Sequence, residues 1–166
     1  MMARAETYRH DEVMSLPSRK TSRVKEIVTF DGNLPEAGPP LSVTLRLEDE
    51  IDTSRGDMIV KPGNLPTVKQ KFDAMLVWMS DGAMVPGKQY LIKHAHKRVP
   101  GRIQKLRYRV DVNSLHRQDA QTLRLNEIGR CAVTVNQPLM FDGYRRNRVT
   151  GAMILIDRLS NETVAA

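Results

Sequence analysis

The sequence has little cysteine, few aromatic residues and no long apolar run. Its 166 residues include a single cysteine, Cys131, which excludes a disulfide within the chain and makes a reducing cytoplasm the expected compartment. The longest apolar run, residues 74–79, is too short to cross a bilayer, and the polar residues 1–10 lack the apolar centre of a secretory signal. We therefore expect a globular cytoplasmic protein with no membrane segment.

Familiar catalytic motifs are also missing. The sequence has no Gly-x-Ser-x-Gly, no His-Glu-x-x-His and no dinucleotide-binding fingerprint. Residues 82–89 spell all but the last position of a phosphate-binding P-loop, where Gln89 replaces the Ser or Thr that would hold magnesium. Pro86 also removes a backbone donor, and the apolar residues that follow are typical of a strand rather than of the required helix. This pattern predicts a β-hairpin turn rather than a nucleotide site.

Metal ligands and nucleophiles are equally sparse. His94 and His96 would lie on the same side of a strand, but a stable zinc site needs a third or fourth ligand. No spacing connects them to His10, His116 or Cys131, so the pattern favours surface histidines. Cys131 alternates with two valines, which favours a place in an apolar core over a role as nucleophile. We therefore predict no catalytic, cofactor-binding or metal-binding residue in this chain.

What the sequence does have is positive charge. The net charge is +7, and residues 93–109 hold seven Lys or Arg and no acid. Such a stretch is compatible with a solvated face, with nucleic acid or with an acidic protein partner. Strict alternation places Tyr108 on the opposite strand face from Lys105, Arg107 and Arg109. The pattern therefore predicts no aromatic platform for stacked bases, although phosphate contacts stay open.

The hydrophobic pattern is that of an all-β protein. Apolar residues alternate with polar ones in short segments separated by turn residues such as Asp-Gly and Pro-Gly, which is typical of sandwiches and barrels. Residues 113–121 suggest a short helix capped by Asn113 or Ser114. Prolines at both ends of residues 61–66 predict a domain junction there, between 1–62 and 67–166. The predicted strands are 23–30, 43–47, 74–79, 88–93, 105–112, 131–135 and 152–157.

Several longer motifs resemble one family. The resemblance extends over roughly residues 11–166, far more than a short motif. The family is the large GTPase subunit of bacterial sulfate adenylyltransferase (ATP sulfurylase), which also occurs fused to adenylylsulfate kinase. The most specific motifs are Asn126-Glu127-Ile128-Gly129-Arg130, Phe141-Asp142-x-Tyr144-x-x-Asn147-x-x-Thr150-Gly151 and Ile156-Asp157-Arg158, supported by residues 29–60, 72–79 and 90–94.

The resemblance implies an elongation-factor-like architecture, in which a GTPase domain precedes two β-barrels. Residues 1–62 would then be a truncated second-domain barrel and residues 67–166 the third-domain barrel. GTP and magnesium would bind to the GTPase domain, which we expect to lie outside this chain. The chain would thus be a fragment that is inactive alone, in a system where the small subunit makes adenylylsulfate and pyrophosphate from ATP and sulfate.

Any retained role would then be the binding of a partner, either the small catalytic subunit or a separate GTPase domain. Arginine suits such interfaces because its planar fork pairs with carboxylates. Two alternatives stay open: an RNA-binding translation-factor barrel, although we do not expect nucleic acid as the partner, and a gene remnant without function. Asn147, Thr150 and Gly151 could also simply shape a turn. The candidate contact residues are Arg130, Tyr144, Arg145, Arg146, Asn147, Arg148 and Thr150.

Overall fold

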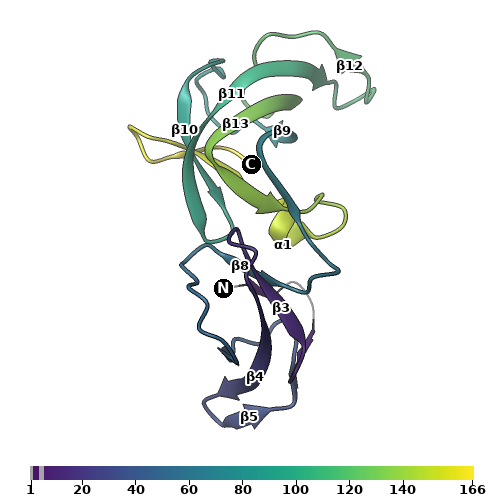
Figure 1. Cartoon of the computed structure of the whole chain (residues 1–166). Coiled ribbons are helices and arrows are strands. Elements are labelled where there is room, and N and C mark those ends of the chain that lie inside the picture. Colours follow the sequence, from purple (N-terminus) through teal and green to yellow (C-terminus); the bar gives the residue numbers. More distant parts are fainter. Residues whose placement is uncertain (1, 4–5) are drawn as a thin grey trace. The chain divides into compact units, whose positions relative to one another are not determined.

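The structure is a computed structural model that describes residues 2–3 and 6–166 (Figure 1). The chain divides into two compact units, Met1–Pro66 and Thr67–Ala166. Both consist of β-strands, apart from one helical turn in the second unit. The all-β prediction is confirmed, and each predicted strand range overlaps a strand.

The first unit is a small twisted sheet. Its central strand β4 is paired with β3 and β5 on one side and with β7 on the other. The order continues from β3 through β8 to β1, and β2 pairs separately with β6. Its core is small because few apolar side chains face inward; Val24 and Ile27 are fully buried. The strands are β1 (Met2–Ala3), β2 (Thr7–Tyr8), β3 (Glu12–Leu16), β4 (Thr21–Thr29), β5 (Gly32–Leu34), β6 (Glu36–Ala37), β7 (Thr44–Leu47) and β8 (Met58–Val60).

The second unit is a closed barrel. Its sheet has the order β15-β14-β10-β11-β13-β9, and the end of β9 returns to β15. The Val77 amide donates to the Ala166 carbonyl at 2.9 Å and the Met79 amide donates to the Val164 carbonyl at 2.8 Å. Closure leaves no free sheet edge at this seam. The elements are β9 (Thr67–Val77), β10 (Gln89–His94), β11 (Lys97–Val110), β12 (Arg117–Gln118), β13 (Ile128–Phe141), α1 (Arg148–Gly151), β14 (Ile154–Asp157) and β15 (Thr163–Ala165).

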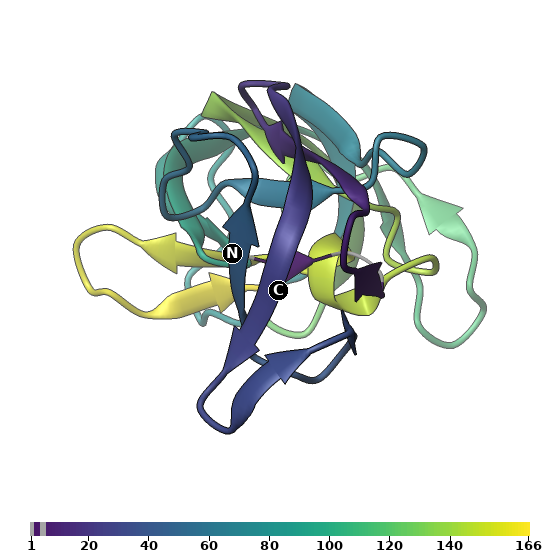
Figure 2. The ribbon, with the colours of Figure 1, turned by 60° about the horizontal axis from the view of Figure 1, so that its bottom comes forward.

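The barrel interior is the main core of the protein. Inward-facing residues alternate with outward-facing ones along the long strands except at bulges, and the buried set includes Ile92, Ile103 and Leu155. Trp78 is 2% exposed, as its apolar neighbourhood predicts, and its indole nitrogen donates to the Gly82 carbonyl at 2.7 Å. Figure 2 shows the turn between β14 and β15 (yellow) extending away from the rest of the barrel, although both strands contribute residues to this core.

The predicted helix at 113–121 is wrong. One carboxylate oxygen of Asp111 accepts hydrogen bonds from the amides of Asn113 and Ser114, which closes a turn instead of a helix. The chain then pairs back on β11 through the two-residue strand β12. Asn and Ser favour turns as well as helix caps, so the cap signal alone could not distinguish the two.

Candidate functional site

Six of the seven predicted contact residues meet in the loop between β13 and β14. A buried polar frame holds this loop. Asp142 follows the last residue of β13, is 5% exposed, and accepts a 2.7 Å hydrogen bond from the hydroxyl of Thr150. The Asp142 amide donates to the Thr150 carbonyl at 3.2 Å. The same carbonyl lies 2.8 Å from Nε2 of His94, which is also buried. Paired buried groups of this kind fix one loop conformation, because breaking any pair leaves a polar group unsatisfied.

The helical turn α1 tightens the loop further. The side-chain oxygen of Asn147 accepts hydrogen bonds from the amides of Val149 and Thr150, at 3.0 and 3.4 Å, and so caps the turn. At Gly151 the backbone passes so close to Tyr144 that a Cβ atom would lie 2.5 Å from the Tyr144 Cα. The loop is therefore shaped by Asn147, Thr150 and Gly151, as the alternative to a contact role for these residues predicted.

The exposed side of the loop carries a different set of side chains. Residues 143–149, which we call the arginine loop, present an exposed tyrosine and three exposed arginines. The Tyr144 side chain is 57% exposed, and the Arg148 guanidinium lies 6.0 Å from the centre of its ring. Val149 next to it is 63% exposed. Arginine and tyrosine on a rigid support are the composition typical of protein-binding hot spots. The other exposed arginines of the loop are Arg145 and Arg146.

Arg130 does not belong to this group. It lies near the start of β13, whereas the arginine loop follows the last residue of that strand. A hydrogen bond with Tyr108, followed by the 3.4 Å ion pair of its guanidinium with Asp73 on β9, raises the pKa of Arg130. The predicted set of contact residues therefore combined two separate surfaces of the barrel.

Tyr108 is on the outer face, contrary to the prediction from strict alternation. A bulge in β11 shifts the register between Leu106 and Tyr108, so that Leu106 pairs with the buried Cys131 while Tyr108 pairs with the exposed Arg130. Residues paired across antiparallel strands share a face. Tyr108 thus lies with Arg107 on the outside, where the Arg117 guanidinium covers its ring at 4.7 Å from the centroid.

The two histidines of the His-x-His pair are separated by the fold. His94 ends β10 and is buried, which corrects its prediction as a surface residue, whereas His96 is exposed in the turn that follows. Over residues 2–3 and 6–166, no group of three or more His, Cys, Asp or Glu side chains could hold a metal ion.

The P-loop-like segment leads into the strand β10 and not into a helix, and it is not a hairpin turn. It connects β9 to β10, and these strands are not neighbours in the sheet, so the hairpin prediction is wrong. The Lys88 ammonium, which a P-loop would direct to phosphate, forms a 2.6 Å ion pair with Asp157. This ion pair, with the amides of Leu159 and Ser160, lowers the pKa of Asp157 to about 2. Lys88 thus connects the start of β10 to the end of β14 within the barrel.

Cys131 lies in the core as predicted, and its burial raises the pKa of its thiol to about 12. Because this folded pKa exceeds the ordinary 9.0, the stability that comes from the neutral thiol is complete below about pH 9 and is lost as the pH rises towards 12.

We expect a thiol reagent at pH 8 to label the Cys131 thiol of the native chain only when the chain unfolds, and to label the urea-unfolded chain at once. Equally fast labelling of both forms would contradict this assignment.

Comparison with known proteins places these features in a family. The model of the family described as "GTP-eEF1A C-terminal domain-like" matches residues 71–166, more than half of the chain. The chain belongs to this family. A solved structure of Sup35 in complex with GDP shares the fold, with a TM-score of 0.82 at 14% identity over 96% of this chain and 40% of that one. No helix within the described ranges 2–3 and 6–166 has the length and apolar character to span a membrane.

Curated relatives of this GTP-eEF1A C-terminal domain-like chain have much higher identity to it than Sup35 has. It is 62% identical over 156 residues to the bifunctional enzyme CysN/CysC of Rhodopirellula baltica. It is 55% identical to sulfate adenylyltransferase subunit 1 of Chromobacterium violaceum and 53% identical to that of Alteromonas mediterranea. Each match covers 94% of this chain but 24%, 33% and 33% of the respective relative. The resemblance predicted from the motifs is confirmed, and the chain spans a quarter to a third of these relatives.

The buried residues that hold the arginine loop were not among the residues predicted for the site. Asp142 and His94 are distant in sequence, and both act on Thr150, one through its hydroxyl and the other through its carbonyl. The one available signal was Asp142, a carboxylate directly after the apolar end of a strand. His94 gave none, because a buried histidine and an exposed one have the same neighbours in a basic stretch.

Proposed function

We propose that this chain is a non-catalytic barrel module of the GTP-dependent subunit of sulfate adenylyltransferase, which activates sulfate with ATP to give adenylylsulfate and pyrophosphate. The observation that carries the proposal is identity above 50% to three relatives of sulfate activation over 94% of the chain. Identity at this level, unlike the 14% shared with Sup35, extends to surface residues as well as to the core. The module couples the GTPase domain to the small catalytic subunit and binds partners in that complex.

The chemistry of the complex comes from outside this chain. The P-loop-like segment uses its lysine in an ion pair with Asp157, and the thiol of Cys131 is buried and neutral. Neither can act on phosphate or on an acyl group. GTP and magnesium therefore bind to a GTPase domain, and ATP and sulfate bind to the small catalytic subunit.

The arginine loop is the part of the module that contacts a partner, which we propose to be the small catalytic subunit. The hydrogen-bonded frame orders the loop before the partner binds. Binding therefore does not have to offset the loss of conformational entropy that ordering a flexible loop would cause. Its exposed guanidiniums and the Tyr144 ring suit a partner surface with carboxylates next to an apolar pocket.

The test is co-purification and titration of the chain with the small subunit. The double variant Arg145→Glu/Arg148→Glu should bind about tenfold more weakly or worse, because two cations that face carboxylates become like charges. Its unfolding midpoint should stay at the wild-type value, since both side chains are exposed.

The matched control is Arg124→Glu, an exposed arginine on a different loop of the same unit. Binding should be unchanged in this variant. Wild-type affinity in the double variant would exclude the arginine loop as the contact. A wild-type chain that never binds the small subunit would favour the remnant hypothesis instead.

A further inference from the structure

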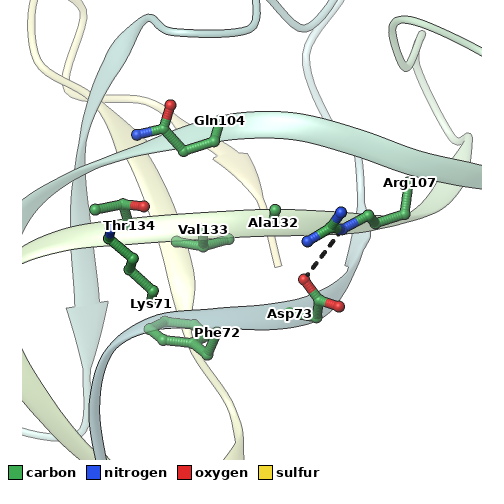
Figure 3. Close-up of a pocket in the computed structure, with 8 residues that line it drawn as sticks. All are labelled: Lys71, Phe72, Asp73, Gln104, Arg107, Ala132, Val133 and Thr134. Carbon is green, nitrogen blue, oxygen red and sulfur yellow. Dashed lines mark hydrogen bonds and ion pairs between the residues drawn. The ribbon is translucent and has the colours of Figure 1, made fainter.

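A shallow depression lies on the outer face of the barrel, over β9, β13 and β11 (Figure 3). Its volume is about 590 Å³. Along its floor lie Ala132, Val133 and Thr134 of β13 and Phe72 of β9, while polar side chains rise from the strands on both sides. The walls are formed by Lys71 and Asp73 of β9 and by Gln104 and Arg107 of β11.

Two bulges in β11 enrich this face in polar side chains. The register shifts once between Ile103 and Lys105 and again between Leu106 and Tyr108. Each shift places two consecutive residues of β11 on the outside, where an unbroken strand would place one. Lys105, which pairs with Ala132 of the floor, is exposed as a result.

The depression already holds one carboxylate between two arginines. One oxygen of Asp73 lies 3.4 Å from Nε of Arg107, and the other lies 3.4 Å from Nε of Arg130. Both contacts are longer than a tight charged hydrogen bond, and the two arginine side chains are 51% and 47% exposed. Exposed ion pairs of this kind add little to the stability of the fold, so the two guanidiniums can exchange Asp73 for a carboxylate of a partner. Lys71 and Lys105 add two further cations, so four positive charges face one negative charge.

The geometry points to a docking groove for an extended, acidic segment of a partner protein. Asp73 shows which chemistry the arginines accept, and the excess of three positive charges attracts further carboxylates. The floor residues Ala132 and Thr134 are two positions apart on a strand. An extended peptide with a carboxylate at every second residue repeats at the same spacing. The groove contains no residue of the arginine loop, and its occupation does not depend on which complex the chain joins.

Other occupants suit this surface less well. The depression is open along its length, so it would leave much of a small ligand in water, whereas small-molecule sites enclose theirs. Bases of single-stranded nucleic acid stack on aromatic rings, but Phe72, the ring in the lining, packs against the barrel core and the Phe141 ring. The adjacent Tyr108 already has the Arg117 guanidinium over one face. A protein segment needs neither an enclosed pocket nor a stacking platform.

The experiment uses the whole chain and three fluorescent probes at low salt: the peptide (Glu-Thr)4, its neutral counterpart (Gln-Thr)4 and an oligouridylate of eight nucleotides. Saturable binding of the Glu peptide is expected, weakening as salt rises. In NMR titrations, the amides of Lys71, Ala132 and Thr134 should shift, and those of the arginine loop should not. The variant Arg107→Gln/Arg130→Gln should bind the Glu peptide at least about tenfold more weakly.

The matched control is Arg98→Gln, which removes an exposed arginine from β11 outside the groove and should leave the affinity unchanged. A thermal melt of each variant should match that of the wild type. The proposal is overturned by equal binding of the Gln peptide, by equal loss in the control variant, or by no saturable binding. Tighter binding of the oligouridylate at the same amides would make the groove a nucleic-acid surface instead. None of these outcomes involves the small subunit, so the groove and the proposed function can fail independently.

Discussion

Replacing Trp78 with alanine should lower the free energy of unfolding of the second unit by about 4 kcal/mol, the usual range for a buried tryptophan. The indole is 2% exposed, meets the Tyr90 ring edge-on at 6.0 Å, and donates to the Gly82 carbonyl. Trp78 also bridges to Ala165 at the seam that closes the barrel. The substitution therefore leaves a cavity where β9 and β15 meet.

Urea unfolding followed by far-ultraviolet circular dichroism measures this loss, since the variant has no other tryptophan. The control is Leu159→Ala at a 90% exposed position of the β14–β15 turn, which should stay within about 0.5 kcal/mol of the wild type. In the wild type, tryptophan emission should be blue-shifted and move to longer wavelength on unfolding. Emission at the solvent-exposed wavelength in the native chain would refute the closed barrel core.

Replacing Gly151 with alanine should destabilise the second unit by about 2–3 kcal/mol, at the upper end for overpacking. The new Cβ would lie 2.5 Å from the Tyr144 Cα and 2.7 Å from its nitrogen, and backbone atoms cannot rotate away as a side chain can. The hydrogen-bonded frame on Asp142 and Thr150 holds Tyr144 in place, so relief of the clash must break that frame. The same substitution should weaken binding to the small subunit, because the arginine loop must move.

Gly143→Ala is the matched control on the same loop. No atom lies within 4 Å of its added Cβ, and the φ angle of Gly143 lies outside the left-handed range. Its stability should change by less than about 0.5 kcal/mol, with any gain coming from the unfolded state. Equal destabilisation by the two substitutions would mean that glycine is required for backbone freedom and not for the close approach to Tyr144.

The predicted strands were found because their signal is local. Leu106 has polar neighbours on both sides in β11, and Cys131 is followed by valines at every second position in β13. Each pattern can therefore be recognised from a few adjacent residues. The very short strand β8 and the final strand β15 were missed, because three residues are too few to establish a period. The predicted helix failed for a related reason, since the turn at Asp111 uses the same Asn and Ser that cap helices.

Positions that depend on pairing were predicted less well. Tyr108 follows Leu106 at the spacing of one strand face, yet the bulge between them places it outside with Arg107 and Arg130. A bulge arises from the register between two strands, so the sequence of one strand does not reveal it. Arg130 was grouped with the arginine loop for a similar reason, because their two motifs follow each other closely in sequence while most of strand β13 separates them in space.

The sequence by itself determined that this protein is all-β, that its thiol is buried, and that it resembles the sulfate adenylyltransferase subunit. These properties follow from the order of apolar and polar residues and from motifs read along the chain. Only the tertiary structure decided that β9 returns to β15 to close the barrel, that His94 and Asp142 hold the arginine loop through Thr150, and that Asp73 lies between two arginines. Each of these contacts joins residues that are distant in the chain or depends on strand register. Their energy exists only when the sheet has formed, and no local pattern records it.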